Sequence, residues 1–88
     1  MLTVGYIPEF VRSYKKLEPE LQEEVWEKIE LFKNPANHRE LRVHKLHGKF
    51  KDCFSFSVNY RVRVIFTYLQ KNKKVAVLLA IGDHEIYR

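Results

Sequence analysis

Three runs of β-forming residues lie between residues 53 and 81, and they constrain the fold more than any other feature of the sequence. The runs span residues 53–58, 61–69 and 74–81, and they are rich in β-branched and aromatic residues. Because the breaks between them are short and polar, each run can form a hairpin with the run before it. The third run is apolar on both faces, which is typical of a strand in the interior of a sheet. We therefore expect an antiparallel meander of three strands.

Two amphipathic helices are predicted before these strands, over residues 8–17 and 19–33. Pro8 and Pro19 each suit the first turn of a helix, where the missing N–H costs nothing. The second helix carries apolar side chains at helical spacing on Leu21, Val25, Ile29 and Phe32. A helical hairpin with one apolar side needs a flat surface to cover.

Residues 2–7 alternate like a short strand that joins the sheet, and residues 36–50 show no clear period and are predicted to be a loop. The predicted order is therefore β-α-α-β-β-β. It corresponds to an α+β fold in which the helical hairpin packs on one face of a small, twisted antiparallel sheet. With 88 residues, the chain is expected to form one domain over residues 1–88.

The composition favours a cytoplasmic protein without membrane contact. No apolar run approaches the ~20 residues that span a bilayer. The first residues lack the basic segment and long apolar segment of a signal peptide. A single cysteine, Cys53, cannot form an intramolecular disulfide and fits a reducing compartment.

Two arginines stand side by side in the second strand-forming run. Arg61 and Arg63 are two positions apart, so a strand would point both to one face, whereas Val64 would point to the core face. Ser55 and Ser57 of the preceding run are expected on the arginine face. That face is predicted to be either solvent surface or a site, because paired arginines supply donors that suit phosphate.

The charge distribution also favours a polyanion as a partner. Residues 33–63 hold eight Lys or Arg against two acids, a net charge of +6, whereas residues 1–32 have a net charge of −3. A basic middle with aromatic residues nearby indicates nucleic acid, although a solvated surface would have the same composition. No nucleotide-binding or serine-hydrolase motif occurs. His44 and His47 form a pair without a third ligand, so we expect neither a metal nor a cofactor.

Further candidate site residues come from separate segments that can meet at one edge of the predicted sheet. They are His47, Lys49, Lys51, His84 and Tyr87. These residue types suit RNA cleavage by its own 2′-hydroxyl, which needs a base, cations around the phosphate and an acid for the leaving oxygen. Each of them could equally be a surface or packing residue.

The chain resembles the RelE/ParE superfamily of bacterial toxin–antitoxin toxins over essentially its whole length. The resemblance rests on the order and spacing of four segments: F-x-x-x-Y-x-K-L at 10–17, K-L-H-G at 45–48, F-S-F-S-V-N-Y-R-V-R-V-I-F at 54–66 and A-I-G-D-H-E-I-Y-R at 80–88. It implies a RelE-like microbial ribonuclease fold and a partner antitoxin. Many members cut mRNA in the ribosomal A site, next to ribosomal RNA, and others poison DNA gyrase.

The resemblance also implies roles for individual residues. Arg63 matches the strand arginine that contacts the scissile phosphate, and His84 and Tyr87 match a terminal base or acid and a stacking residue. The residues expected to hold RNA are His47, Lys49, Lys51 and Arg61. The predicted function is a ribosome-dependent, metal-independent mRNA endonuclease toxin. The alternatives are a gyrase poison and a non-catalytic member that binds its antitoxin or acts as a co-repressor.

Overall fold

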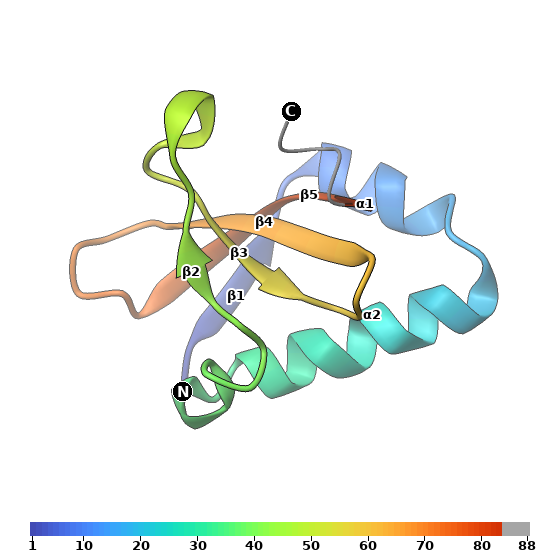
Figure 1. Cartoon of the computed structure of the whole chain (residues 1–88), viewed down its shortest axis with the longest axis horizontal. Coiled ribbons are helices and arrows are strands. Elements are labelled where there is room, and N and C mark those ends of the chain that lie inside the picture. The colour runs from blue at the N-terminus through green and yellow to red at the C-terminus, as the bar shows by residue number, and fades with distance from the viewer. Residues whose placement is uncertain (84–88) are drawn as a thin grey trace.

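The structure, a computed structural model that describes residues 1–83, places two α-helices on a five-stranded sheet (Figure 1). The strands are β1 (Thr3–Tyr6), β2 (His44–Lys45), β3 (Phe54–Ser57), β4 (Val62–Tyr68) and β5 (Val75–Asp83). The helices are α1 (Pro8–Lys15) and α2 (Pro19–Phe32), and short 3-10 helices cover Pro35–Asn37 and Gly48–Phe50. The predicted α+β class and the predicted helical hairpin on a sheet are confirmed.

The sheet order is β1-β5-β4-β3-β2, and it differs from the prediction in two respects. The meander of β3, β4 and β5 is antiparallel as expected, but β1 pairs with β5 in parallel, with Thr3 opposite Val75. The sheet is therefore mixed. Both helices and three strands separate β1 from β5, so no hairpin fixes their relative direction. The second difference is β2, inside the predicted loop, whose two residues are too few to show an alternating pattern.

The two helices are bonded directly to each other. Each begins at a proline in its first turn, as predicted, and neither has a side-chain N-cap. The hydroxyl of Tyr14 donates to the carbonyl of Gln22 (3.1 Å), and the side-chain amide of Gln22 donates back to the carbonyl of Tyr14 (3.0 Å). This reciprocal pair helps to fix the angle between α1 and α2.

An aromatic cluster between α2 and the sheet forms the centre of the core. The ring of Phe32 stacks on those of Phe56 (4.5 Å) and His38 (4.8 Å) and meets Phe66 edge-on (4.6 Å). Phe32, Phe56 and Phe66 are fully buried. Because Val64 is buried in the same cluster, the predicted core face of β4 is confirmed. This packing anchors β3 and β4 against α2.

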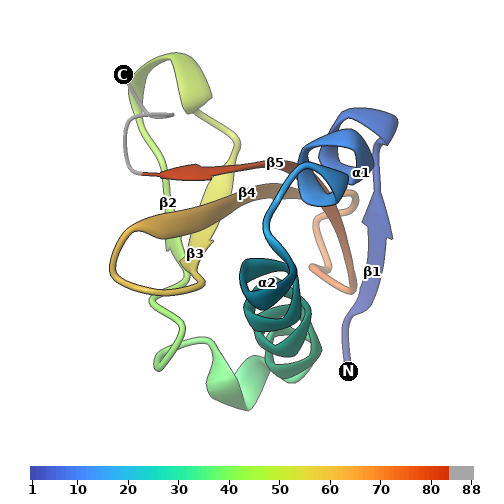
Figure 2. The ribbon, with the colours of Figure 1, turned by 90° about the vertical axis from the view of Figure 1, so that its right-hand side faces the viewer.

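The two edges of the sheet lie on opposite sides of the molecule, with β1 at one and the β2–β3 arm at the other (Figure 2). Neither α-helix within residues 1–83 is long and apolar enough to cross a membrane.

Candidate functional site around the turn between β3 and β4

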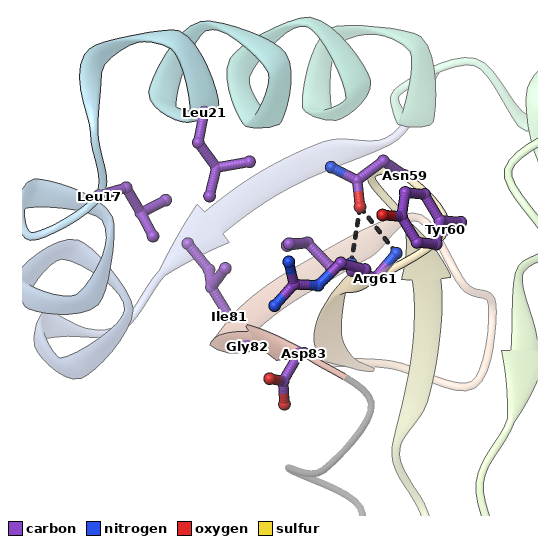
Figure 3. A pocket seen from close by; sticks show the side chains of 9 residues that line it. Leu17, Leu21, Asn59, Tyr60, Arg61, Ile81, Gly82 and Asp83 are labelled. Atoms are coloured by element: carbon purple, nitrogen blue, oxygen red, sulfur yellow. Dashed lines mark hydrogen bonds between the residues drawn. The ribbon is translucent and has the colours of Figure 1, made fainter.

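The turn between β3 and β4 is built around the side chain of Asn59. Its Oδ1 accepts hydrogen bonds from the backbone N–H groups of Arg61 and Val62, both at 2.8 Å (Figure 3). The N–H of Val58 donates to the carbonyl of Val62 at 2.9 Å and closes the hairpin. Asparagine favours such turns because its short amide can replace a backbone partner. The backbone between β3 and β4 is therefore held by three short hydrogen bonds.

The same asparagine ties the turn to helix α2. Its Nδ2 donates to the carboxylate Oε1 of Glu24 at 2.8 Å, across 35 positions of sequence. A hydrogen bond to a charged acceptor is stronger than one between neutral groups. The turn consequently has a fixed position relative to the helical hairpin as well as a fixed shape.

Arg63 folds back onto this turn. Its Nη1 donates to the carbonyl of Asn59 (2.5 Å) and to the carbonyl of Val62 (3.2 Å), and its side chain is half-buried. An arginine carries five N–H donors in a planar fork. Backbone oxygens thus hold Nη1 of the guanidinium. Within residues 1–83 the other N–H donors of Arg63 have no hydrogen-bond partner, so they can bind an anion.

Two further cations share a cleft with Arg63. The cleft has a volume of about 340 Å³ and lies between α2, residues 40–42 and the turn. Lys28 and Arg42 line it together with Arg63, and Glu40 is the acid among the lining residues. None of the three cations forms an ion pair with another residue of the described chain. The cleft is therefore electropositive, which suits a phosphate.

Arg61 lies in a different cleft, and the predicted pairing of the two arginines is wrong in this respect. Strand β4 begins at Val62, so Arg61 belongs to the turn, where strand alternation does not apply. Its side chain is exposed and lines a cleft of about 480 Å³ with the apolar side chains of Leu17 and Ile81. Figure 3 shows the guanidinium of Arg61 extending toward that side of the turn.

The predicted open face of arginines and serines is also partly closed. Ser55 is fully buried and its Oγ has no hydrogen-bond partner among the described residues, while Ile65, its partner in β4, is 3% exposed. Ser57 and Arg63, which pair at the end of the two strands, are half-buried. The middle of this face is therefore covered, and its polar residues are accessible only near the turn.

The basic loop residues lie at the other end of β3. His47, Lys49 and Lys51 are exposed in and beside the short helix at Gly48–Phe50, and Lys49 Nζ stands 5.4 Å from the ring centre of Phe50. The two described clefts at the turn contain none of these three residues. The structure thus separates these basic loop residues from Arg63 by the length of β3.

The predicted catalytic residues His84 and Tyr87 lie outside the described residues. Strand β5 continues to Asp83, two residues beyond the predicted end, and Gly82 is the β5 partner of Arg63. Gly82 and Asp83 also line the cleft that holds Arg61. The end of β5 is therefore next to the turn.

The other described histidines and the cysteine are placed elsewhere. A ring nitrogen of His44 lies 2.8 Å from the carbonyl of Arg42, and one of His38 lies 2.8 Å from the carbonyl of Phe32. Burial, with a smaller contribution from the neighbouring aspartate, raises the pKa of the Cys53 thiol. Within residues 1–83, no three His, Cys, Asp or Glu side chains gather as a metal ion would require.

Sequence reasoning missed four residues around the turn, namely Glu24, Lys28, Arg42 and Asn59. Asn59 was expected in the turn between the first two strand-forming runs, and what sequence reasoning missed is the hydrogen bonding of its side chain. Arg42 has a positive φ of 58°, and the N–H of Ser57 donates to the carbonyl of Leu41 at 2.8 Å, which brings this segment beside β3. No local pattern in the sequence indicates that contact.

Comparison with solved structures identifies proteins that share the fold of this chain. No protein-family model matches the sequence, and no curated protein matches it. Solved structures do match. A chain of the toxin–antitoxin complex RelBE2 from Mycobacterium tuberculosis is 19% identical, with a TM-score of 0.70, and the match covers 94% of this chain and 98% of that one.

Two E. coli structures match over similar lengths. YafQ is 13% identical, with a TM-score of 0.75 and coverage of 98% of this chain and 97% of that one. A chain of the intact RelBE toxin–antitoxin complex is 15% identical, with a TM-score of 0.69 and coverage of 94% of this chain and 96% of that one. The chain therefore has the α+β fold of the RelE-like toxins over nearly its whole length.

Proposed function

We propose that this chain is the toxin of a toxin–antitoxin pair and that it cleaves mRNA on the ribosome without a metal ion. The proposal is supported by the fold, which extends over nearly all of the chain and of the matched toxin–antitoxin structures. It is carried by one observation, which is that Arg63, Lys28 and Arg42 line the same cleft. A phosphate in that cleft would meet three positive charges, one of them positioned by backbone oxygens.

The proposed reaction is an internal transesterification. The ribose 2′-oxygen attacks the adjacent phosphorus and the bond from phosphorus to the 5′-oxygen breaks, which gives a 2′,3′-cyclic phosphate and a free 5′-hydroxyl. A base takes the proton of the 2′-hydroxyl, and an acid gives a proton to the leaving 5′-oxygen. Negative charge builds on the phosphorus oxygens in the transition state. Donors that are already oriented toward this charge lower the barrier.

Arg63 is assigned to the reacting phosphate, because backbone carbonyls hold Nη1 of its guanidinium in place and the other N–H donors can bind the phosphate oxygens. His84 is our hypothesis for the base or acid, and Tyr87 for a stacking or positioning residue. Two sets of basic residues at opposite ends of β3 would then hold successive parts of the RNA. The set at the basic loop, assigned to neighbouring RNA phosphates or ribosomal RNA, is His47, Lys49 and Lys51.

An antitoxin is the second proposed partner. The basic surface around the loop and the cleft would attract acidic segments of an antitoxin chain. Such a chain would neutralise Lys49, Lys51 and Arg63 and exclude RNA at the same time. We expect cells to tolerate this chain only when its antitoxin is produced with it.

The test is primer extension on a reporter mRNA in a translation extract, with and without ongoing initiation. Wild-type protein should produce new 5′ ends only when the message is translated, and Arg63→Gln should cut about 100-fold more slowly, because a charge-stabilising donor is lost. Arg12→Gln is the matched control, because Arg12 is an exposed arginine on α1, in the acidic part of the chain.

Other outcomes would replace the proposal. Intact messages together with loss of supercoiling by purified DNA gyrase would indicate a gyrase poison. Intact messages without growth arrest would indicate a non-catalytic antitoxin-binding protein. Cleavage by Arg63→Gln at the wild-type rate would remove Arg63 from the mechanism.

A further inference from the structure

Tyr60 is a large aromatic residue in an exposed position on a rigid turn. It is 85% exposed, although tyrosine is not a favoured turn residue. The residues around it are fixed, since Asn59 binds the backbone of Arg61 and Val62 and is tied to Glu24. An exposed ring on a held backbone is a preformed surface for another flat molecule.

The surroundings of Tyr60 suggest what that molecule is. Asn59 and Tyr60 line both clefts at the turn, so the turn forms a ridge between them. One cleft contains Arg61 and the other contains Arg63 with Lys28. Figure 3 shows Tyr60 beside Asn59 at the turn, with the guanidinium of Arg61 extending toward Ile81 and Asp83. An aromatic ring between two clefts that each contain an arginine matches the alternation of bases and phosphates along a single nucleic-acid strand.

We propose that Tyr60 stacks on an unpaired base of the bound RNA while Arg61 and Arg63 hold the phosphates on either side of it. The RNA strand would cross the turn between the two clefts, with the nucleotide at Tyr60 next to the phosphate in the Arg63 cleft. Tyr60 would therefore influence which nucleotide lies beside the cut. This inference rests on the proposed function for its substrate, but it concerns binding and can be tested without cleavage.

The experiment measures binding of the full chain to a fluorescein-labelled single-stranded RNA of about 10 nucleotides by anisotropy, over a series of salt concentrations. Tyr60→Ala should weaken binding roughly 5- to 150-fold, the range seen when a stacked base loses its aromatic partner. Tyr60→Phe and Tyr60→Trp should bind like wild type, because they keep a ring. A duplex of the same length should bind wild type and Tyr60→Ala equally, because its bases are already stacked.

The salt dependence separates stacking from charge. Each phosphate contact contributes a slope of about 0.7 to the plot of log affinity against log salt for single strands. Arg61→Gln should therefore lower the slope by about that amount, whereas Tyr60→Ala should lower the affinity and leave the slope unchanged. Leu69→Ala is the matched control, since Leu69 is an aliphatic residue, 64% exposed, just after β4. It should change neither quantity.

The outcomes distinguish this inference from the proposed function. RNA binding by wild type that depends on Tyr60, without message cleavage, would support the stacking site and overturn the endonuclease. Cleavage by wild type together with equal RNA affinities for Tyr60→Ala, Tyr60→Phe and wild type would support the endonuclease and overturn the stacking site. Absence of RNA binding by wild type would overturn the stacking site. Circular dichroism of each variant checks that the turn substitution leaves the fold intact.

Discussion

Replacing Asn59 by alanine should destabilise the protein more than the same change in the other hairpin turn. Asn59→Ala removes two acceptor bonds to backbone N–H groups and the donor bond to Glu24. Asn72 makes the same kind of turn between β4 and β5, but with one bond, from the N–H of Lys74 at 3.1 Å. Asn72→Ala is therefore a matched control for the loss of an asparagine turn.

The magnitudes follow from the number and type of bonds. A neutral hydrogen bond contributes about 0.5–1.5 kcal/mol net, and one to a charged group contributes more. Since the turn is partly exposed, we take the low end for each bond. Asn59→Ala should then cost about 2 kcal/mol, and Asn72→Ala about 0.5 kcal/mol. In a domain of this size 1 kcal/mol corresponds to roughly 4–8 °C in Tm, so the expected losses are about 10 °C and about 3 °C.

Thermal unfolding followed by far-ultraviolet circular dichroism checks both values. Glu24→Gln should retain most of the stability, because an amide oxygen can still accept from Asn59 Nδ2. The double variant Asn59→Ala with Glu24→Gln should lose little more than Asn59→Ala alone, because the two side chains share one bond. Equal changes in Tm for Asn59→Ala and Asn72→Ala would refute the reasoning, because the tether to α2 would then add nothing.

Three further predictions concern the core and the closed face. Ser55→Ala should raise the free energy of unfolding, measured in urea, by about 1 kcal/mol, because it removes a buried hydroxyl without a described partner. A free energy of unfolding below that of wild type would contradict this. Phe32→Ala should lower the free energy of unfolding by about 3–5 kcal/mol, and Leu31→Ala, 39% exposed, by far less. Alkylation of Cys53 at pH 8 should be slower in the folded chain than in denaturant, because the raised pKa of its thiol leaves less thiolate. The raised pKa also favours the folded state below about pH 8.5, and this contribution to the free energy of unfolding is lost as the pH rises further.

The elements of the fold could be predicted from the sequence, because each long element has a period or a proline that marks it. The third strand-forming run, apolar on both faces, does lie inside the sheet, between β1 and β4. The direction of β1 could not be predicted, because it depends on a contact with β5 far away in sequence. Alternation of residue types cannot show where a strand begins. For that reason the sequence predicts Arg61 on the same strand face as Arg63, whereas β4 begins at Val62.

The site was predictable only in part. Because Val64 and Phe66 of β4 face the core, alternation points Arg63 to the opposite face of the sheet, and this position identified it as a candidate site residue. Its neighbours Lys28 and Arg42 reach the same cleft through tertiary packing, from a helix and from a residue with positive φ. Ser55 was expected to be accessible because it is polar and alternates with phenylalanines. Its burial shows that alternation separates two faces and does not show which of them meets water.

The parallel pairing of β1 with β5 has a consequence for how the molecule is made. Thr3 cannot pair until Val75 has been synthesised, nor Tyr6 until Leu78, so the edge strand is added to the sheet late. Contacts between such distant positions are also slow to form, because a long loop must close first. A nascent chain therefore cannot complete this sheet until β5 has emerged from the ribosome. Since β5 also pairs with β4, with Gly82 opposite Arg63, we expect the strand that carries Arg63 to gain its second neighbour only after that point in synthesis.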